Sequence, residues 1–424
     1  IDAYLAHRYI PAPRTIFQNI HRLENGHYLH YRLDTHQLTK HFYWQPHGEA
    51  GDWQQELDTA IRIRTVADRP LGVFLSGGID SSTIACRLKE QGFDQLQTFS
   101  AAFPGSQLDE SSIASQIAST LGLPNQIIPV PLTIAKDFDQ IVADLDEPFA
   151  DPSSFPTWYL AKSTTQHVKV VLGGDGGDEL LGGYKRLSKH LRTSWRRLLR
   201  IPLPRMVDMA GKGWRKTVEE LRLNWLEAYS LRFSGMTPGQ RAFLQPGLKK
   251  PLVTYWRYPS IDVLNQLSPI KQLLAVDLNN YLPEYILRKG DLCTMAHGLE
   301  LRAPLLDHVW VERIIALSDK ERFTHPAKKL FIAVTDRLAS LDLFNIKKRG
   351  FNPPLKPWLQ DDLQHRFTGL GARLQAQTQG QINAQRVERL IVEYQSRPAL
   401  AEQMLQLLIL DASLAQLEIL VHAC

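Results

Sequence analysis

Cysteine is scarce in this sequence, with three residues among 424. Cys86, Cys293 and Cys424 lie far apart and form no CxxC pair, which excludes a disulfide framework and a cysteine-rich zinc site. This cysteine usage is typical of a reducing compartment, so we expect the protein to be cytoplasmic.

Long apolar runs and a strong excess of one charge are also missing. The richest apolar stretch, residues 404–410, is interrupted by Gln406 and followed by Asp411, so we expect no membrane segment. The net charge of +5 is too small to predict a nucleic-acid partner. Hydrophobic residues make up 44% and charged residues 22% of the chain, which predicts a folded protein with a large buried core.

An initiating methionine is absent as well. The chain begins with Ile1, has no methionine before Met206 and carries no charged-then-apolar leader. We therefore expect a fragment or a processed product of a longer protein.

Short β-branched and apolar runs alternate with longer helical patterns between residues 65 and 190, which predicts a doubly wound parallel α/β domain. The expected helices cover residues 81–91 and 108–121, and Gly92 and Gly122 follow them where a left-handed cap belongs. The expected strands are residues 70–75, 96–103, 126–130 and 168–172.

The remaining chain has two different patterns. Residues 191–424 contain long helical stretches such as 273–282 and 400–421, so we expect a mostly helical second half. Residues 1–46 carry Asn25-Gly26 and the alternating run HYLHYRL, which favour strands and a turn. The histidines of this segment lack the spacing of metal ligands on one element.

The first expected strand runs into a glycine and hydroxyl loop, SGGIDSS, that opens a helix. Two glycines permit a tight turn, and the first-turn N–H groups of a helix attract phosphate. A plain turn with Asp80 as helix cap is the simpler interpretation, but the strand before and the helix after favour a phosphate loop. No GxxxxGK[ST] motif occurs in the chain, so the loop is not a Walker A motif.

A second loop, GGDGGDELLGGY, follows the strand at 168–172 and is both glycine-rich and acidic. Carboxylates beside a phosphate loop would repel ATP unless a hard cation such as Mg²⁺ lies between them. A dinucleotide fingerprint is the rival interpretation, but Glu179 stands where GxGxxG requires its third glycine. The sequence therefore predicts a site for ATP and Mg²⁺.

The SGGIDSS string resembles the PP-loop of the N-type ATP pyrophosphatases, and together the two loops resemble the synthetase domain of the asparagine synthetase B family. Three further stretches are similar: residues 146–159 (DEPFADPSSFPTWY), 281–307 (YLPEYILRKGDLCTMAHGLELRAPLLD) and 347–351 (KKRGF). One departure is Leu292, since relatives usually have arginine after the aspartate that is Asp291 here. The resemblance implies an α/β sheet of the PP-loop ATP pyrophosphatase type over residues 50–424, with a helical second half.

The resemblance also implies roles for individual residues. Asp80 and Asp178 would hold Mg²⁺ on the pyrophosphate, and Leu75, Ala101 and Gly174 would line the AMP pocket. The other expected nucleotide-binding residues belong to the two loops: Ser76, Gly77, Gly78, Ser81, Ser82 and Gly173.

Two residues are candidate catalytic groups on the same grounds. Asp175 stands where the family has an acidic residue linked to acyl-adenylate formation, and Lys348 where it has a lysine over the phosphates. Without the resemblance, Lys348 would be an ordinary exposed loop lysine. The implied reaction is attack of the aspartate side-chain carboxylate on the α-phosphorus of ATP, loss of pyrophosphate, and amidation of the acyl-adenylate by ammonia.

In this family, ammonia comes from glutamine through an N-terminal glutaminase domain whose nucleophile is an amino-terminal cysteine. Residues 1–46 resemble only the C-terminal end of that domain. Cys86 is expected inside a helix, where an apolar-facing cysteine belongs to the core and is no nucleophile.

Other functions remain open from the sequence. Relatives amidate or cyclise other carboxylates, such as components of surface polysaccharides, β-lactam precursors and peptides. A non-catalytic synthetase-like protein that binds a partner is a second alternative, although both loops are intact, with Asp80, Asp178 and the glycines present. A tRNA-modifying PP-loop enzyme is disfavoured by the small net charge. We expect small-molecule substrates (aspartate, ATP, and ammonia or glutamine) and a homodimer.

Overall fold

The computed structural model describes residues 1–104, 109–197, 220, 223–344 and 353–423. Its centre is a five-stranded parallel sheet in the order β5-β4-β3-β6-β7. The strands are β3 (Leu71–Phe74), β4 (Gln97–Ala102), β5 (Asn125–Pro129), β6 (Val170–Leu172) and β7 (Glu300–Arg302). This architecture confirms the predicted parallel α/β fold.

Helices cover both faces of the sheet, as parallel strands with crossover connections require. Side chains alternate along β3, so that Val73 lies in one apolar cluster with α2, α3 and α4, while Phe74 packs in another with Leu160 of α6. The helices of this half are α2 (Trp53–Ile63), α3 (Ile79–Glu90), α4 (Ser111–Leu121), α5 (Phe138–Ala143), α6 (Ser154–Thr164), α7 (Gly177–Leu181) and α8 (Lys185–Leu191).

The second half of the chain is mainly helical, as expected. The α-helices after residue 220 are α10 (Trp225–Ser230), α11 (Pro238–Leu244), α12 (Ile261–Asn265), α13 (Pro269–Val276), α14 (Arg288–Met295), α15 (His308–Ala316), α16 (Asp319–Arg322), α17 (Leu355–Pro357), α18 (Leu370–Gln377), α19 (Ala384–Ser396) and α20 (Ala401–Ala423). A π-helical stretch, η4 (Asp277–Leu287), continues α13 into α14. In the described part of the chain, no helix has the length and apolarity needed to cross a membrane.

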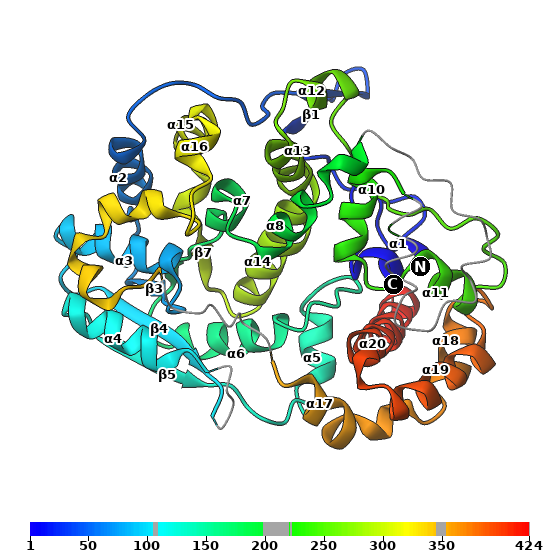
Figure 1. The fold of residues 1–424 in the computed structure, drawn as a ribbon. Helices are drawn as coiled ribbons and strands as arrows, with labels where there is room; N and C mark the ends of the chain where they lie inside the picture. The colour runs from blue at the N-terminus through cyan, green and yellow to red at the C-terminus, as the bar shows by residue number, and fades with distance from the viewer. Residues whose placement is uncertain (105–108, 198–219, 221–222, 345–352, 424) are drawn as a thin grey trace.

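The N-terminal residues pack against the helical half. Helix α1 (Asp2–His7) lies beside α20, where the Tyr4 hydroxyl donates to the carbonyl of Gln406 at 2.7 Å (Figure 1). Tyr4 and Leu5 are fully buried, so this segment belongs to the largest apolar core.

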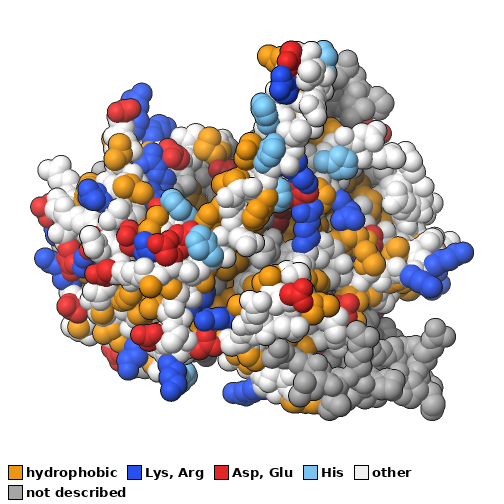
Figure 2. All heavy atoms as spheres, turned by 90° about the horizontal axis from the view of Figure 1, so that it is seen from above, with side chains coloured by type: hydrophobic (Ala, Val, Ile, Leu, Met, Phe, Trp, Pro, Cys, Tyr) orange, Lys and Arg blue, Asp and Glu red, His pale blue; other side chains and the backbone are white. Residues whose placement is uncertain are grey.

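The following β-hairpin differs, because both of its faces lie open. Strands β1 (His27–Arg32) and β2 (Gln37–Phe42) pair only with each other in the described structure. Large apolar side chains remain exposed along it: Tyr28, Leu29, Tyr31, Leu38 and Phe42. Figure 2 shows histidine side chains gathered on the part of the molecule that projects in that view, in keeping with the four histidines of this hairpin.

Three elements differ from the sequence expectations. Strand β7 is a short edge strand that alternation did not reveal, and α1 is a helix of six residues in a segment read as strands and a turn. The hairpin turns at residues 33–36, whereas Asn25-Gly26 lies before β1. Leu292, the departure from the family pattern, is partly buried against the largest apolar core, which its apolar side chain suits.

Burial of His7 makes the stability of the helical half depend on pH. Its Nε2 accepts the N–H of Tyr255 at 2.9 Å, and burial, with a smaller contribution from the positive charge of Arg241, lowers the pKa of His7 to about 3. The unfolded chain gains a proton near pH 6.5 while the folded chain stays neutral until far lower pH. This contribution to the free energy of unfolding is therefore present above pH 6.5 and is lost as the pH falls towards 3.

We expect His7→Gln to reduce the fall of the unfolding free energy between pH 6.5 and 4.5 by up to about 1.4 kcal/mol per pH unit. Glutamine can still accept from Tyr255 but cannot titrate. The measurement is urea denaturation across this range, with exposed His308→Gln as the matched control. Equal pH slopes in wild type and His7→Gln would contradict the assignment.

Candidate active site

The two glycine-rich loops meet at the carboxyl edge of the sheet. Strands β3 and β6 are neighbours, but the chain proceeds from β3 towards β4 on one side and from β6 towards β7 on the other. Such a switch in strand order opens a crevice at the carboxyl ends of the two strands, where open α/β sheets bind ligands. The loop after β3 and the loop after β6 both border this crevice.

The loop after β3 adopts a tight turn that glycine makes possible. Gly77 has φ +75°, in the left-handed region, and the extended Gly78 is the N-cap of α3. Hydroxyl groups brace the turn: Ser82 Oγ donates to Gly78 O at 2.8 Å, and Ser81 Oγ accepts the N–H of Ser76 at 3.2 Å. Because Gly78 has no side chain to cap α3, the first-turn N–H groups and the helix dipole form a site for an anion.

The loop after β6 approaches the first turn of α3 so closely that its glycine positions leave no room for a side chain. A Cβ at Gly174 would lie 2.8 Å from the backbone nitrogen of Ser81, and one at Gly177 would lie 2.2 Å from Asp80 Oδ1. A Cβ at Gly183 would lie 1.9 Å from Asp178 Oδ1. These glycines therefore bring Asp178 next to Asp80, although the two residues are far apart in sequence.

Asp80 and Asp178 converge on one positive charge, the ammonium of Lys328. Its Nζ lies 2.5 Å from Asp178 Oδ1 and forms an ion pair with Asp80 Oδ2. The Lys328 side chain is only 4% exposed. Two carboxylates that share one cation have the donor chemistry of a hard-cation site, so these residues fit Mg²⁺, with phosphate oxygens or water as the remaining ligands.

Glu179, next to Asp178, is buried beneath the loop. Burial, together with the neighbouring charge of Asp178, raises the pKa of Glu179 to about 7. Its carboxyl group accepts a hydrogen bond of 2.5 Å from the Tyr184 hydroxyl. This hydrogen bond fixes the end of the loop to Tyr184. Neither Glu179 nor Tyr184 was expected to belong to the site.

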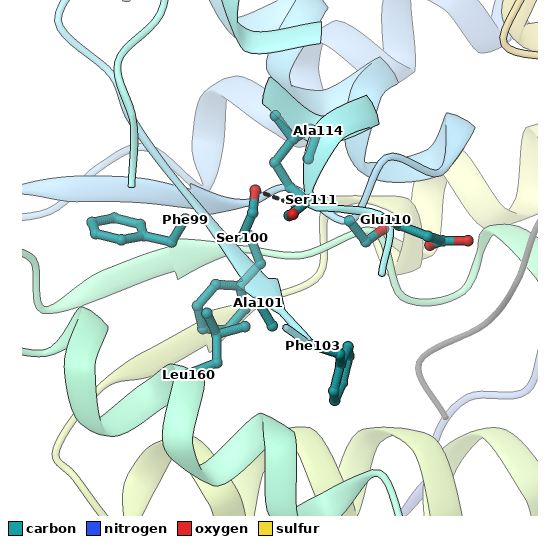
Figure 3. Close-up of a pocket in the computed structure, with 11 residues that line it drawn as sticks. Phe99, Ser100, Ala101, Phe103, Glu110, Ser111, Ala114 and Leu160 are labelled. Atoms are coloured by element: carbon teal, nitrogen blue, oxygen red, sulfur yellow. Dashed lines mark hydrogen bonds between the residues drawn. The ribbon is translucent and has the colours of Figure 1, made fainter. Parts of the chain in front are cut away.

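A pocket lies beside the first loop, between β4, α4 and α6 (Figure 3). Its lining is largely apolar, and its rim reaches Ser76 of the phosphate loop. Ser100 Oγ donates to the carbonyl of Leu75 at 2.7 Å and fixes the end of β3. The lining residues include Leu75, Ser76, Phe99, Ala101, Phe103, Ala114 and Leu160. Leu75 and Ala101, both expected around AMP, therefore share a pocket, whereas Gly174 lies at the contact between the loops.

A second charged group adjoins Asp175. Lys289 Nζ donates to Ser153 Oγ at 3.1 Å and lies 3.5 Å from Asp151 Oδ2. Burial alone would lower the pKa of Lys289, but the negative charges of Asp151 and Asp175 raise it above its usual value. Asp151, Ser153 and Lys289 lie in stretches that carry the family resemblance, but their sequence context predicts no role for them.

Two further expected residues have different outcomes. Gly173 follows β6 at the same edge, and a Cβ there would lie 3.3 Å from Asp175 Oδ2. Lys348 and the rest of KKRGF lie outside the described residues. Lys328 was missed because the surrounding HPAKKLF carries no motif; only the fold brings it to the site.

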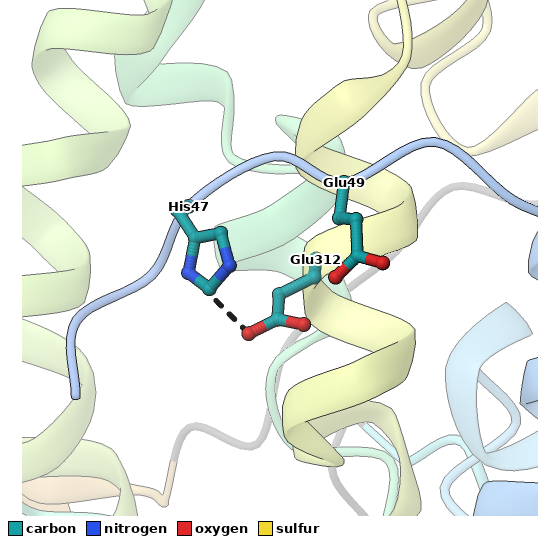
Figure 4. A group of neighbouring side chains, drawn as sticks. All are labelled: His47, Glu49 and Glu312. Carbon is teal, nitrogen blue, oxygen red and sulfur yellow. Dashed lines mark ion pairs between the residues drawn. The ribbon is translucent and has the colours of Figure 1, made fainter.

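Another group of possible metal ligands lies away from the crevice (Figure 4). His47 Nδ1 is 3.4 Å from Glu312 Oε1, which also accepts from Trp44 Nε1 at 3.0 Å. Glu49 is paired with Arg313 at 3.2 Å. These contacts attach the linker before α2 to helix α15, which accounts for the group without a metal ion.

Cys86 lies on α3 and is fully buried in the apolar core. Burial, with a smaller contribution from Glu90, raises the pKa of its thiol to about 12. A thiol that is neutral and enclosed at physiological pH is no nucleophile, which agrees with its expected place in the core.

Residues 52–420 match the family described as asparagine synthase. The chain is 28% identical over 393 residues to asparagine synthetase [glutamine-hydrolyzing] 1 of Bacillus subtilis (strain 168), covering 86% of this chain and 60% of that protein. It is 24% identical over 442 residues to amidase chry2 of Gibberella zeae, covering 88% of this chain and 64% of that protein.

The match to a putative asparagine synthetase [glutamine-hydrolyzing] of Mycobacterium tuberculosis (strain ATCC 25618 / H37Rv) is similar, at 28% identity and 85% of this chain. This chain spans 58% of that protein, so it covers about three fifths of these curated relatives. An NH3-dependent NAD synthetase from Campylobacter jejuni is 17% identical over 38% of this chain and 92% of that chain, with a TM-score of 0.24.

Proposed function

Because this chain belongs to the asparagine synthase family, we propose that it is a carbon-nitrogen ligase that activates a carboxylate with ATP and amidates it with ammonia. One observation supports this proposal above all. Asp80 and Asp178 both pair with the ammonium of Lys328, next to the glycine-rich loop that precedes α3. A single carboxylate or a lone glycine turn would be common in unrelated proteins. The carboxylate pair and the glycine-rich turn lie together where the strand order of the sheet reverses. This combination favours a reaction on a polyphosphate.

The two loops and the adjoining pocket would bind different parts of ATP. The first-turn N–H groups of α3 and the loop Ser76–Ser82 would hold the phosphates, with the helix dipole opposing their negative charge. The pocket that includes Leu75 and Ala101 adjoins Ser76, so it would take the adenosine end of the same ATP. Gly173 and Gly174 would let the second loop approach the phosphates.

Mg²⁺, when held by Asp80 and Asp178, would supply positive charge to the departing pyrophosphate. The acceptor carboxylate would attack the α-phosphorus from the side of Asp175, and the bond to the bridging oxygen of pyrophosphate would break. We also propose that Lys348 binds the phosphates and stabilises the negative charge of the departing pyrophosphate. Ammonia would then attack the acyl-adenylate and release AMP.

We propose aspartate as the acceptor, giving asparagine. The support is the two relatives named asparagine synthetase and a charged group suited to an amino acid. Lys289 offers an ammonium for a carboxylate, while Asp151 and Asp175 offer negative charge for an amino group.

A different acceptor is the second candidate. The relative named an amidase, from Gibberella zeae, is similar to this chain over 88% of its length, so not every similar protein is named a synthetase. The competing prediction is adenylation of another carboxylate, such as one on a polysaccharide component, β-lactam precursor or peptide.

Residues 1–46 are proposed to be the C-terminal end of an N-terminal-nucleophile glutaminase domain, with residues 50–424 as the synthetase domain. Two observations support this division. Apolar side chains of the β1–β2 hairpin are exposed, and the match covers 60% of the length of the Bacillus subtilis relative. A complete glutaminase domain would supply ammonia from glutamine, and ammonium can replace it in an assay of residues 1–424. We also propose that the protein is cytoplasmic and forms homodimers.

The proposal is tested by pyrophosphate release from Mg-ATP with ammonium, comparing aspartate with no acceptor and with glutamate, and by the mass of the product. Aspartate-dependent release with formation of asparagine supports the assignment. Release that depends on another carboxylate selects the second candidate. A folded, ATP-binding chain that releases no pyrophosphate with any acceptor would support a non-catalytic synthetase-like protein.

Enlarging Ala101 should weaken ATP binding while leaving the chemical step intact. A leucine there adds three carbons to a side chain that lines the pocket beside Ser76. We expect Ala101→Leu to raise the KM for ATP about tenfold or more with little change in kcat. Ala376→Leu, at an exposed position of α18, is the control. An unchanged KM for ATP in Ala101→Leu would show that the adenosine end of ATP does not bind in this pocket.

A further inference from the structure

Lys328 lies where a cation bridging Asp80 and Asp178 would lie. Its Nζ forms an ion pair with Asp80 Oδ2 and lies 2.5 Å from Asp178 Oδ1, and the side chain is almost completely buried. The two carboxylates come from the loops after β3 and β6, while Lys328 precedes η6 (Lys329–Val334) in the second half of the chain. Three distant parts of the sequence therefore build one charge cluster.

The backbone around Lys328 aims this side chain at the carboxylates. Lys328 has φ +66°, an uncommon left-handed conformation for a residue with a side chain. Its carbonyl accepts the N–H of Phe331 at 2.9 Å, and Phe331 is fully buried in the core. Gly183 leaves room for the lysine, since a Cβ at residue 183 would lie 2.5 Å from Lys328 Cε. Packing on both sides thus holds the ammonium between the two loops.

A divalent cation and this ammonium require the same oxygens. Both positive charges cannot share the carboxylate pair at such short distances without strong repulsion. A cation that arrives alone must therefore displace Lys328, whereas the phosphates of a nucleotide would give Lys328 another anionic partner. Lys328 would thus oppose binding of the metal alone more than binding of metal and nucleotide together.

We propose that Lys328 is an internal counter-ion that competes with the divalent cation for the carboxylates of Asp80 and Asp178. This inference rests on the proposed function, which makes the pair a metal site. It gives Lys328 a positioning role: the lysine keeps the carboxylates together and sets the affinity of the site for metal. A purely structural ion pair would predict the opposite response, because loss of the lysine would disorganise the carboxylates.

The test uses Mn²⁺ as a spectroscopic substitute for Mg²⁺, without nucleotide, and measures free Mn²⁺ by electron paramagnetic resonance. We expect Lys328→Met to bind Mn²⁺ at least about tenfold more tightly than wild type, because the competing charge is gone. Methionine is unbranched and one atom shorter than lysine, and it imposes the same left-handed backbone requirement. Lys329→Met is the matched control, since Lys329 is adjacent but exposed, and it should bind as wild type does.

A second substitution locates the effect. Adding Asp178→Asn to Lys328→Met should abolish the gain in Mn²⁺ affinity. Affinity in Lys328→Met that is equal to or weaker than that of wild type would overturn the proposal, as would a gain that survives Asp178→Asn.

A measurement on the wild-type chain keeps the proposal falsifiable if the variant does not fold. Reductive methylation followed by peptide mass spectrometry compares the rates at Lys328 and Lys329. We expect Lys328 to be protected and its rate to rise with saturating Mn²⁺, while Lys329 is unaffected; a constant rate at Lys328 would overturn the proposal. Neither readout needs turnover, so a chain that makes no amide but responds to Mn²⁺ in this way would refute the proposed function alone.

Discussion

Asp178→Asn should lower the rate of acceptor-dependent pyrophosphate release by about 10²–10³-fold. Asp178 forms one side of the carboxylate pair, and its replacement by a neutral amide removes half of the negative charge that would hold Mg²⁺. The amide has nearly the same shape, so the Gly183 contact is preserved. The measurement is steady-state pyrophosphate release at saturating ATP, aspartate and ammonium, with circular dichroism to confirm folding.

The exposed Asp262→Asn on α12 is the matched control and should retain wild-type turnover. A folded Asp178→Asn protein with normal turnover would contradict the assignment of this carboxylate pair to the metal. Restoration of turnover by raised Mg²⁺ would, in contrast, support it.

Gly177→Ala should reduce turnover by about 10²-fold while changing the unfolding free energy little. The new methyl group would lie 2.2 Å from Asp80 Oδ1 and 2.6 Å from Asp80 Cγ. Because the clash falls on the end of a side chain, the carboxylate can move away at small cost to the fold. It would then leave the position that it shares with Asp178, and the site loses its geometry. The measurement is pyrophosphate release together with urea denaturation.

Gly247→Ala is the matched control, since no other atom lies within 4 Å of its new methyl group. This control should retain both turnover and stability. If Gly177→Ala turned over at the wild-type rate, the position of the Asp80 carboxylate would have no bearing on the reaction.

The predicted strands were read from the sequence with ends within two residues of those observed, because local pattern determines them. β3, β4 and β5 are short apolar runs between turn residues, and Gly122 has φ +63° at the end of α4 as its position suggested. The phosphate loop was recognisable for the same reason: strand, glycine turn and helix follow one another in the chain.

Residues placed by tertiary contacts could not be found in this way. β7 has only three residues and exists because it pairs with β6 at the sheet edge. Helix α1 has six residues, five of them buried, so it is too short to give a periodic signal, and its helicity depends on burial against α20. Lys328 gives no local sign of its role, since its partners Asp80 and Asp178 lie on loops far earlier in the chain.

The most direct test of the account follows the oxygen atoms of the acceptor. Aspartate labelled with ¹⁸O in its side-chain carboxylate is incubated with this chain, Mg-ATP and ammonium, and the nucleotide products are analysed by mass spectrometry. Attack of the carboxylate on the α-phosphorus predicts AMP that carries one ¹⁸O atom, formed in equal amount with pyrophosphate and asparagine. ADP with label in inorganic phosphate, or AMP without label, would contradict the account.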